Sequence, residues 1–246
     1  MGKKDRTHEL NLEFLDLYQK AALENAHSLL NEAKLLLSNN YFARAYFLAV
    51  ASIEETGKAH MAFSSKGRNL SNHALHKTLK EMFEDHSRKI GAAFIGWLTD
   101  SKEKEEKVEA LFNYMGHLKR GREKSMYVDA GNGNTVTNPL QSVRPVAAKD
   151  STLIAEKCLH FTRKLLLSEP YKTSTFDDKY LCIKGGTHQA LLSDSDFGAF
   201  LLHHLKTDGQ KFNWSKCIVT YHDAYYCRGK KFRNQSDNST LEPSAS

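Results

Sequence analysis

Apolar residues recur every three or four positions over most of the chain, and this spacing constrains the fold more than any other feature. Such a period places the apolar side chains on one face of an α-helix. Segment 12–38 shows the period in the positions Leu15, Tyr18, Ala22, Ala26, Leu29, Ala33 and Leu36. Four later segments repeat it, at 41–63, 71–97, 100–118 and 145–167. We therefore predict an all-α protein whose residues 1–168 form a helical bundle, with no sheet between residues 10 and 167.

Polar residues mark the expected helix ends. Asn39–Asn40 should end the first helix, and Ser71 or Asn72 should cap the third. The spacing of Asp100 and Glu103 resembles a capping box and predicts the start of the fourth helix.

Two further features of this region bear on the site. The third helix is expected to run unbroken through His86, which falls on its apolar stripe. Residues 129–145 contain two glycines, two prolines and several asparagines, which predicts a long loop. Pro145 suits the first turn of the fifth helix.

The helical period weakens beyond residue 168. We expect residues 169–228 to form a C-terminal extension of mostly helical or mixed structure. Within this extension, residues 181–186 should form a short strand and residues 193–206 a helix. Residues 214–227 could form either a helix or a strand. The polar composition of 229–246 predicts a disordered tail.

Composition and charge restrict the class of protein. Hydrophobic residues make up 40% of the 246 residues, and no apolar run reaches the roughly 20 residues of a membrane helix. The basic N-terminus lacks the apolar segment of a secretory signal, so we expect a cytoplasmic protein without membrane contact. The formal net charge of +6 permits contact with a polyanion. The basic cluster at 228–233 is expected to be a solvated patch or a nonspecific polyanion contact.

The four cysteines include no C-x-x-C pair, which indicates reduced thiols. Cys217, His222 and Cys227 are spaced five residues apart and would offer a zinc ion at most three ligands. We therefore expect no metal and no cofactor.

Residues 53–58 concentrate charge beside an alanine-rich stripe that should be buried. Glu54 and Lys58 lie four residues apart on one helix face. One interpretation is an intrahelical ion pair, with Gly57 allowing close helix packing. The other is a functional site to which Glu54 or Glu55 contributes, since buried charges need partners.

His86 and Lys89 share a helix face through their three-residue spacing. His86 is either a core histidine or part of a site. A carboxylate from Glu54 or Glu55 on a neighbouring helix would orient its imidazole and tune its protonation. A di-iron bundle would need a pair of Glu-x-x-His motifs, which the sequence lacks.

A basic cluster ends the fourth expected helix, at Lys119, Arg120, Arg122 and Lys124, with Tyr127 just beyond. Cations at a helix C-terminus complement the helix dipole, which is one explanation. Guanidinium groups beside an aromatic ring also hold phosphate and a stacked base, so the other interpretation is RNA binding.

The chain resembles the AbiV family of abortive infection proteins, which belongs to the HEPN superfamily. The resemblance rests on NAHSLLNEAKLLL, YFARAYFLAVASIEETGKA, DHSRK and RGREKSMYVD with a downstream Asn-Pro, in one order over about residues 20–167. It implies a helical domain, usually dimeric, of a bacterial antiphage system. Such a system shuts down host translation or growth when a phage component triggers it.

Many HEPN proteins are metal-independent ribonucleases with an Arg-x4-6-His motif. Arg68-x4-His73 fits that spacing but is expected by chance and falls in a predicted loop. At the usual late position this chain has Arg122-x4-Tyr127, with tyrosine in place of histidine.

The resemblance then suggests roles for the candidate residues. His86 would be the general acid or base, and Arg122 and Lys89 would stabilise phosphate charge. Tyr127 would stack or hydrogen-bond, and Glu54 or Glu55 would orient the imidazole. The remaining cations would bind RNA, namely Lys58, Lys119, Arg120 and Lys124.

Three functional hypotheses follow. The first is an antiphage effector that cleaves RNA as a metal-independent endoribonuclease. The second is a noncatalytic toxin that binds RNA or the translation machinery after triggering by a phage protein. The third is a regulatory module whose long loop or C-terminal region senses that protein. The expected partners are RNA, a phage-encoded activator and a second copy of the chain, the last also suggested by the small residues on the second helix.

Overall fold

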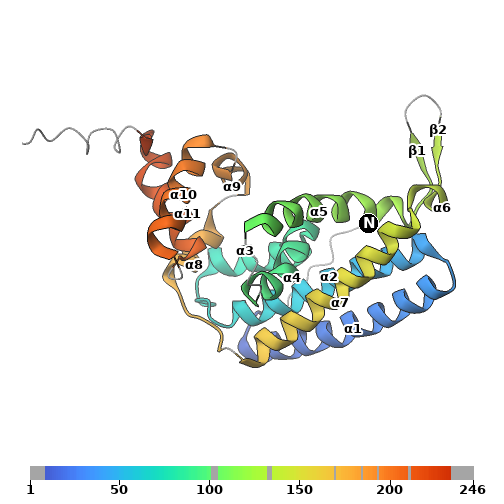
Figure 1. Ribbon diagram of the computed structural model, residues 1–246. Helices are drawn as coiled ribbons and strands as arrows, with labels where there is room; N and C mark the ends of the chain where they lie inside the picture. The colour runs from blue at the N-terminus through green and yellow to red at the C-terminus, as the bar shows by residue number, and fades with distance from the viewer. Residues whose placement is uncertain are drawn as a thin grey trace, which may run out of the picture. The chain divides into compact units, whose positions relative to one another are not determined.

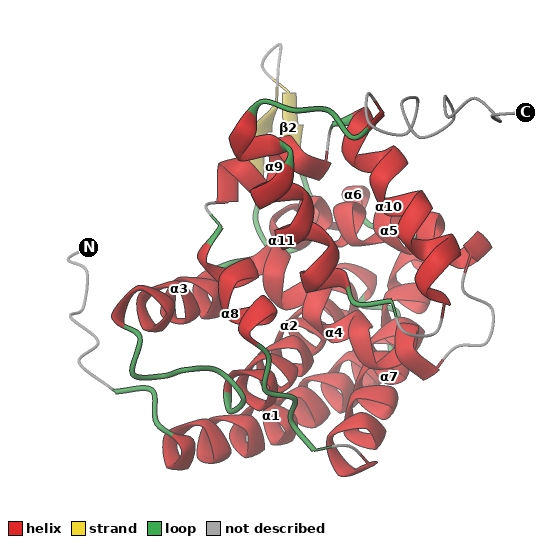
Figure 2. Cartoon of the chain, turned by 90° about the vertical axis from the view of Figure 1, so that its left-hand side faces the viewer, coloured by secondary structure: helices red, strands yellow, loops and turns green. Residues whose placement is uncertain are grey.

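The computed structural model describes residues 9–100, 105–131, 135–168, 170–183, 185–192, 194–209 and 212–233. These residues are helical apart from short connections and one two-stranded hairpin (Figure 2). The predicted all-α fold class is therefore confirmed. The chain divides into two compact units, of which unit 1 holds 1–70 and 79–172, and unit 2 holds 71–78 and 173–246.

Unit 1 is a bundle of long helices (Figure 1). Its elements are α1 (Leu12–Ser38), α2 (Phe42–Ser65), the end of α3 (His73–Glu84), α4 (His86–Asp100), α5 (Glu105–Lys124), β1 (Asp129–Gly131), β2 (Thr135–Thr137), α6 (Pro139–Ser142) and α7 (Pro145–Ser168). The helix α2 lies at the centre, in contact with α1, α4, α5 and α7. It is therefore the element from which a site inside the bundle can be assembled.

Small residues explain how α2 packs against several helices at once. Ala45, Ala49, Ser52, Thr56 and Ala59 are all fully buried. Their short side chains allow neighbouring helix backbones to approach closely. These small residues pack against other helices of the same chain, so they give no support for a dimer interface on α2.

The helix ends follow the expected capping chemistry. Asn39 is the C-cap of α1, and Asn40 follows it with a positive φ of 62°. The Asn72 side chain accepts hydrogen bonds from the backbone amides of Ala74 and Leu75 at the start of α3. α7 begins at Pro145, as predicted. The capping spacing expected at 100–103 lies largely outside the described residues.

The expectation of one unbroken third helix is wrong. α3 ends at Glu84 and α4 begins at His86. The Asp85 carboxylate accepts hydrogen bonds from the backbone amides of Ser87 (2.7 Å) and Arg88 (3.2 Å), and it thereby caps a new helix. His86 therefore lies in the first turn of α4 rather than in the middle of a helix.

The expected loop at 129–145 contains regular structure, so the expectation of no sheet between residues 10 and 167 is wrong at this segment. β1 pairs antiparallel with β2, so that Asp129 faces Thr137 and Gly131 faces Thr135, and α6 follows. The β-branched run Thr135–Thr137 favours extended backbone, which the helical-period analysis overlooked. The hairpin projects from one end of unit 1 (Figure 1) and is not part of its core.

Unit 2 is helical as well. After the start of α3 it contains α8 (Thr175–Cys182), α9 (Gly185–Leu192), α10 (Ser195–Asp208), α11 (Trp214–Ala224) and the 3-10 turn η2 (Tyr226–Arg228). The strand expected at 181–186 is wrong, because α8 ends at Cys182 with Ile183 as its C-cap. For residues 214–227 the sequence allowed either a helix or a strand, and the structure shows α11 followed by η2.

A buried aspartate organises the core of unit 2. Asp196 accepts hydrogen bonds from the Tyr221 hydroxyl (2.8 Å) and from the backbone amides of Phe232 and Arg233. Lys231 forms an ion pair with Asp194 at 2.9 Å. The start of the expected tail is thus bonded to α10, and residues 234–246 lie outside the described residues.

No helix among the described residues is long and apolar enough to span a bilayer.

The buried His60 on α2 makes stability depend on pH. Burial lowers the pKa of this imidazole from 6.5 to about 4. Between these values the unfolded chain binds more protons than the folded chain, so stability is present above pH 6.5 and is lost as pH falls towards 4. The loss amounts to about 3 kcal/mol in the free energy of unfolding. Urea unfolding at pH 7 and pH 4.5 measures it, and His60→Gln should show a smaller loss. An equal loss in both proteins would contradict this account.

Candidate functional site

Glu54 is the centre of a cluster of charged side chains inside unit 1. Its carboxylate comes from the middle of α2, and the side chain is only 6% exposed. The Oε2 atom lies 2.8 Å from Nδ1 of His86 and 3.8 Å from Nζ of Lys89. Both partners come from the first turn of α4, where Asp85 begins the helix. The negative charge of the buried carboxylate is thus compensated by Lys89, and also by His86 when that imidazole is protonated.

Arg122 reaches the same carboxylate from the C-terminal end of α5. Its Nε lies 3.1 Å from Oε1 of Glu54. Its guanidinium carbon lies 5.5 Å from the ring centre of Phe47, a cation–π contact. Phe47 and Glu54 are seven residues apart and share one face of α2, so one helix holds the guanidinium at two points.

The contact between Arg122 and Glu54 is an ion pair without a hydrogen bond. Although Nε and Oε1 are 3.1 Å apart, neither atom has a hydrogen-bond partner within the described part of the chain, and both are buried. The distance between the two atoms is short enough for a hydrogen bond. The N–H bond of Arg122 therefore points too far away from Oε1 to form one. Buried polar atoms without such partners are rare in folded proteins and are found at functional sites.

Two glycines allow the three helices to meet at this point. A Cβ atom on Gly57 would lie 1.7 Å from the carbonyl oxygen of Lys89, so only glycine permits this approach of α2 and α4. A Cβ atom on Gly121 would lie 2.3 Å from the hydroxyl oxygen of Tyr46, next to Arg122. Burial raises the pKa of Tyr46 to about 12, so its hydroxyl stays protonated.

The cluster carries excess positive charge and is open on one side. Glu54 contributes one formal negative charge against one positive charge each on Lys89 and Arg122, so the sum is +1 when His86 is neutral. Burial lowers the pKa of Lys89, while the neighbouring Glu54 opposes that shift. The side chains of His86 and Arg122 are 44% and 25% exposed, but that of Lys89 is only 6% exposed. An anion from solution can therefore reach His86 and Arg122.

Four of the predicted residues are therefore brought together: Glu54, His86, Lys89 and Arg122. Glu55 is not part of this group. It forms an ion pair with Lys58 at 2.6 Å, three residues along α2. This corrects the expected pairing of Lys58 with Glu54, because a step of one residue turns a helix by about 100°.

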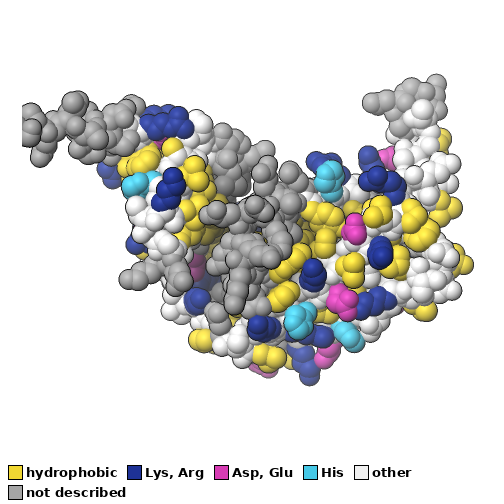
Figure 3. Space-filling view, viewed as in Figure 1, with side chains coloured by type: hydrophobic (Ala, Val, Ile, Leu, Met, Phe, Trp, Pro, Cys, Tyr) yellow, Lys and Arg dark blue, Asp and Glu magenta, His cyan; other side chains and the backbone are white. Residues whose placement is uncertain are grey.

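The other predicted cations lie on the surface of α5. Lys119, Arg120 and Lys124 are exposed, and so is Tyr127 beyond the helix end. Figure 3 shows Lys and Arg side chains along the edge formed by α5. Tyr127 is 64% exposed, and no hydrogen bond or ion pair between described residues joins it to the cluster around Glu54.

Sequence reasoning overlooked three supporting residues. Phe47 holds Arg122, and Gly121 sets the approach of α5 to α2. Arg44 donates a hydrogen bond to the backbone carbonyl of Met126 at 3.0 Å, which ties the segment after α5 to α2. The adjacent glycine and arginines in Arg120–Arg122 were the available signal, because a glycine inside a helix implies a close neighbour.

Comparison with known proteins agrees with this architecture. A family model described as AbiV, HEPN_AbiV, matches residues 14–160. The chain belongs to the AbiV family. It is thus an abortive infection protein of antiphage defence, and the matched segment contains all four residues of the Glu54 cluster. No curated protein and no solved structure matches the chain. Among the described residues, no group of three or more His, Cys, Asp or Glu side chains is arranged to hold a metal ion.

Glu54 and Glu55 are adjacent acids with different surroundings, and they provide a matched pair of variants. Glu54→Gln keeps the size of the side chain but leaves the buried Lys89 and the partly buried Arg122 without their counter-charge. We expect it to lower the free energy of unfolding by about 3 kcal/mol. Glu55→Gln removes only a partly exposed pair and should lower it by about 1 kcal/mol or less. Urea unfolding at pH 7 measures both, and equal losses would show that Glu54 is not the centre of the charge cluster.

Proposed function

We propose that this AbiV protein acts on RNA during abortive infection as a metal-independent endoribonuclease. The observation that carries the proposal is that the half-exposed imidazole of His86 and the partly exposed guanidinium of Arg122 each contact one oxygen of the same buried carboxylate. An oriented imidazole transfers protons, and a guanidinium stabilises the charge on a phosphate.

The proposed reaction uses the ribose 2′-hydroxyl as the nucleophile. Nδ1 of His86 is engaged with Glu54, so Nε2 is the ring nitrogen that exchanges protons with the substrate. It accepts the 2′-hydroxyl proton as the 2′-oxygen attacks phosphorus. The bond from phosphorus to the 5′-oxygen breaks, and the leaving 5′-oxygen takes a proton from water. The products are a 2′,3′-cyclic phosphate and a free 5′-hydroxyl. Arg122 stabilises the charge on the phosphate oxygens.

Lys89 and the remaining cations take supporting roles in this proposal. Lys89 is too buried to contact RNA directly, so it acts as a positioning residue that compensates Glu54. The exposed cations on α5 are Lys119, Arg120 and Lys124, and they bind the RNA backbone through charge. Tyr127, 64% exposed, offers a stacking surface for a base.

A noncatalytic toxin is the second candidate. The late Arg-x4-Tyr spacing, Arg122 to Tyr127, favours it, because tyrosine stands where the ribonuclease motif has histidine. In this case Arg122 and the α5 cations bind RNA or the translation machinery, and His86 has no chemical role.

Two partner proposals rest on the family alone. We propose a homodimer, for which sedimentation at micromolar concentration should give twice the mass of one chain, and a monomer would refute it. We also propose a phage-encoded activator, which should raise RNA cleavage when it is added to the purified protein.

His86→Gln tests the catalytic proposal, with His27→Gln as the matched control. His27 is an exposed histidine on α1, away from the Glu54 cluster and from the cations of α5. In the presence of EDTA, the wild-type protein should cleave single-stranded RNA to products that end in 2′,3′-cyclic phosphate. His86→Gln should lower the cleavage rate about 100-fold or more, since imidazole proton transfer is lost. His27→Gln should stay within about twofold.

RNA binding by the same variants separates the two candidate functions. His86→Gln should still bind RNA, whereas Arg122→Ala should lose both binding and cleavage. Cleavage that survives in His86→Gln, or that disappears with EDTA, would refute the proposed mechanism. Binding and toxicity without cleavage in the wild-type protein would favour the noncatalytic candidate.

A further inference from the structure

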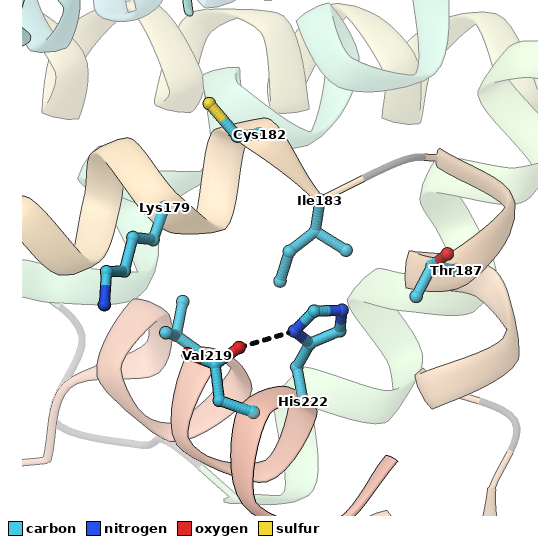
Figure 4. Close-up of a pocket in the computed structure, with 7 residues that line it drawn as sticks. Lys179, Cys182, Ile183, Thr187, Val219 and His222 are labelled. Atoms are coloured by element: carbon cyan, nitrogen blue, oxygen red, sulfur yellow. Dashed lines mark hydrogen bonds and ion pairs between the residues drawn. The ribbon is translucent and has the colours of Figure 1, made fainter. Parts of the chain in front are cut away.

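A cavity of about 460 Å³ lies in unit 2. It is lined by Lys179, Cys182, Ile183, Thr187, Val219, His222 and Asp223. Figure 4 shows the His222 ring directed into the space between Ile183 and Thr187, with the dashed line marking its contact with Asp223. Lys179 and Asp223 carry opposite formal charges, which cancel when His222 is neutral. The cavity therefore has no excess charge to select an anion, whereas such an excess is found in unit 1, at the N-terminal end of α2.

Arg44 lies in the first turn of α2, and its side chain is exposed. Phe47 follows it after three residues and Glu54 after ten, which keeps the three side chains on one face of the helix. Phe47 and Glu54 both hold Arg122. Arg44 therefore extends the row of side chains that positions Arg122 towards the start of α2.

The segment after α5 holds the guanidinium of Arg44. Nη1 donates a hydrogen bond to the carbonyl oxygen of Met126 at 3.0 Å and lies 2.9 Å from the sulfur of the same residue. Both contacts involve Nη1, and a guanidinium has further N–H donors on Nε and Nη2. Two such donors match two oxygens of a phosphate in a bidentate contact. The contact with Met126 thus fixes an exposed cation that can still bind an anion.

Two exposed tyrosines are close to Arg44 along the backbone. Tyr41 is the N-cap of α2, three residues before Arg44, and is 58% exposed. Tyr127 directly follows Met126, whose carbonyl group Arg44 contacts, and is 64% exposed. The start of α2 and the end of α5 meet near the hairpin at one end of unit 1 (Figure 1). Unpaired RNA bases stack on tyrosine rings, so this end combines a phosphate donor with stacking surfaces.

Positive charge exceeds negative charge in the two segments that meet here. Residues 41–53 contain Arg44 as their single charged side chain, and residues 119–129 contain four cations and the two acids Glu123 and Asp129. The excess is three positive charges. A polyanion is therefore attracted to this surface, and its binding releases the counterions that surround its phosphates.

The length of this surface sets the length of RNA that it fits. Arg44 and Glu54 are ten residues apart. This separation corresponds to about 15 Å along the axis of α2. Phosphates of one stacked strand lie about 3.4 Å apart along its axis, so the interval spans about four nucleotides of a stacked strand and fewer of an extended one.

We infer that Arg44, Tyr41 and Tyr127 form an RNA subsite that binds a phosphate and stacks unpaired bases beside the Glu54 cluster. The subsite rests on the RNA function proposed above, and it names the substrate as a single-stranded segment of about four nucleotides or more. A duplex of the same length presents paired and stacked bases, so it should bind more weakly.

Binding of a single-stranded RNA of ten uridines to the full-length protein, measured by fluorescence anisotropy, tests the phosphate contact. Arg44→Gln should raise the Kd about tenfold, because one charge-assisted contact to phosphate is lost. The slope of log affinity against log salt concentration should become shallower by about 0.7, the value for one phosphate of a single strand. An unchanged Kd or an unchanged slope would overturn the role of Arg44.

Arg163→Gln is the matched control, since Arg163 is an exposed arginine in the C-terminal half of α7. Its Kd should stay within about twofold of the wild-type value, with the same salt slope. Arg44→Lys keeps the charge but loses the planar pair of donors, so it should restore the slope and only part of the affinity. Equal losses of affinity in Arg163→Gln and Arg44→Gln would show unspecific attraction by charge and overturn the subsite.

Tyrosine variants test the stacking surfaces. Tyr41→Leu and Tyr127→Leu should each raise the Kd about fivefold or more, since each removes a ring on which a base stacks. Tyr41→Phe and Tyr127→Phe keep the ring and should stay within about twofold of the wild-type value. Equal affinities of the Leu and Phe variants at one position would overturn the stacking role of that tyrosine.

The affinity of the wild-type protein separates the subsite from the RNA function itself. Wild-type protein whose binding of the ten-uridine RNA is unaffected by Arg44→Gln would overturn the subsite alone. Wild-type protein that binds no RNA would overturn both. A duplex bound as tightly as the single strand would overturn the assignment of a single-stranded substrate.

Discussion

A buried carboxylate on α2 is the interaction on which the candidate site depends. Removing an isolated carboxylate from water costs several kcal/mol, and only nearby opposite charge or hydrogen bonds can offset that cost. Glu54 meets this requirement by drawing on two other helices, with His86 and Lys89 from α4 and Arg122 from α5. The same constraint therefore packs the bundle and arranges the site. Its geometry leaves Arg122 Nε, among the described residues, buried without a hydrogen bond.

Much of this arrangement could be predicted from residue types and spacing. Helical periodicity located α1 within one residue at each end, because an apolar stripe at 3.6-residue spacing has no other regular explanation. All four residues of the Glu54 cluster were candidates. Glu54, His86 and Lys89 were named because charge on a stripe expected to be buried requires partners. Arg122 was named from the basic cluster at a helix end, and the family resemblance suggested its role beside His86. Their distances needed the structure.

The errors came from choices that period and composition leave open. Neither can decide whether Glu54 or Glu55 turns inward, because that depends on the rotation of α2 against α4. The break at Asp85 was missed because the apolar stripe continues across it, while the side chain of one aspartate starts a new helix. The hairpin was hidden among the glycines and asparagines of a segment that resembles a loop.

The two units contain different groups of polar side chains. Unit 1 contains the cationic cluster around Glu54 and residues 14–70 and 79–160 of the segment matched by the AbiV model. Unit 2 contains the remaining matched residues, 71–78, together with 173–246, which lie beyond the match. A buried acid organises the polar groups in each, Glu54 in the first and Asp196 in the second. Asp196, however, is satisfied by hydrogen bonds, which suits a structural role.

A double-mutant cycle between Glu54 and Arg122 tests the central claim most directly. Glu54→Gln, Arg122→Met and the double variant are unfolded in urea at pH 7, beside the same cycle with Glu55→Gln as the control. The account predicts a coupling energy of about 1 kcal/mol or more for Glu54 with Arg122, because the two are in contact. For Glu55 with Arg122 it predicts less than about 0.5 kcal/mol. Additive effects of Glu54→Gln and Arg122→Met would contradict the claim that one buried carboxylate holds the site together.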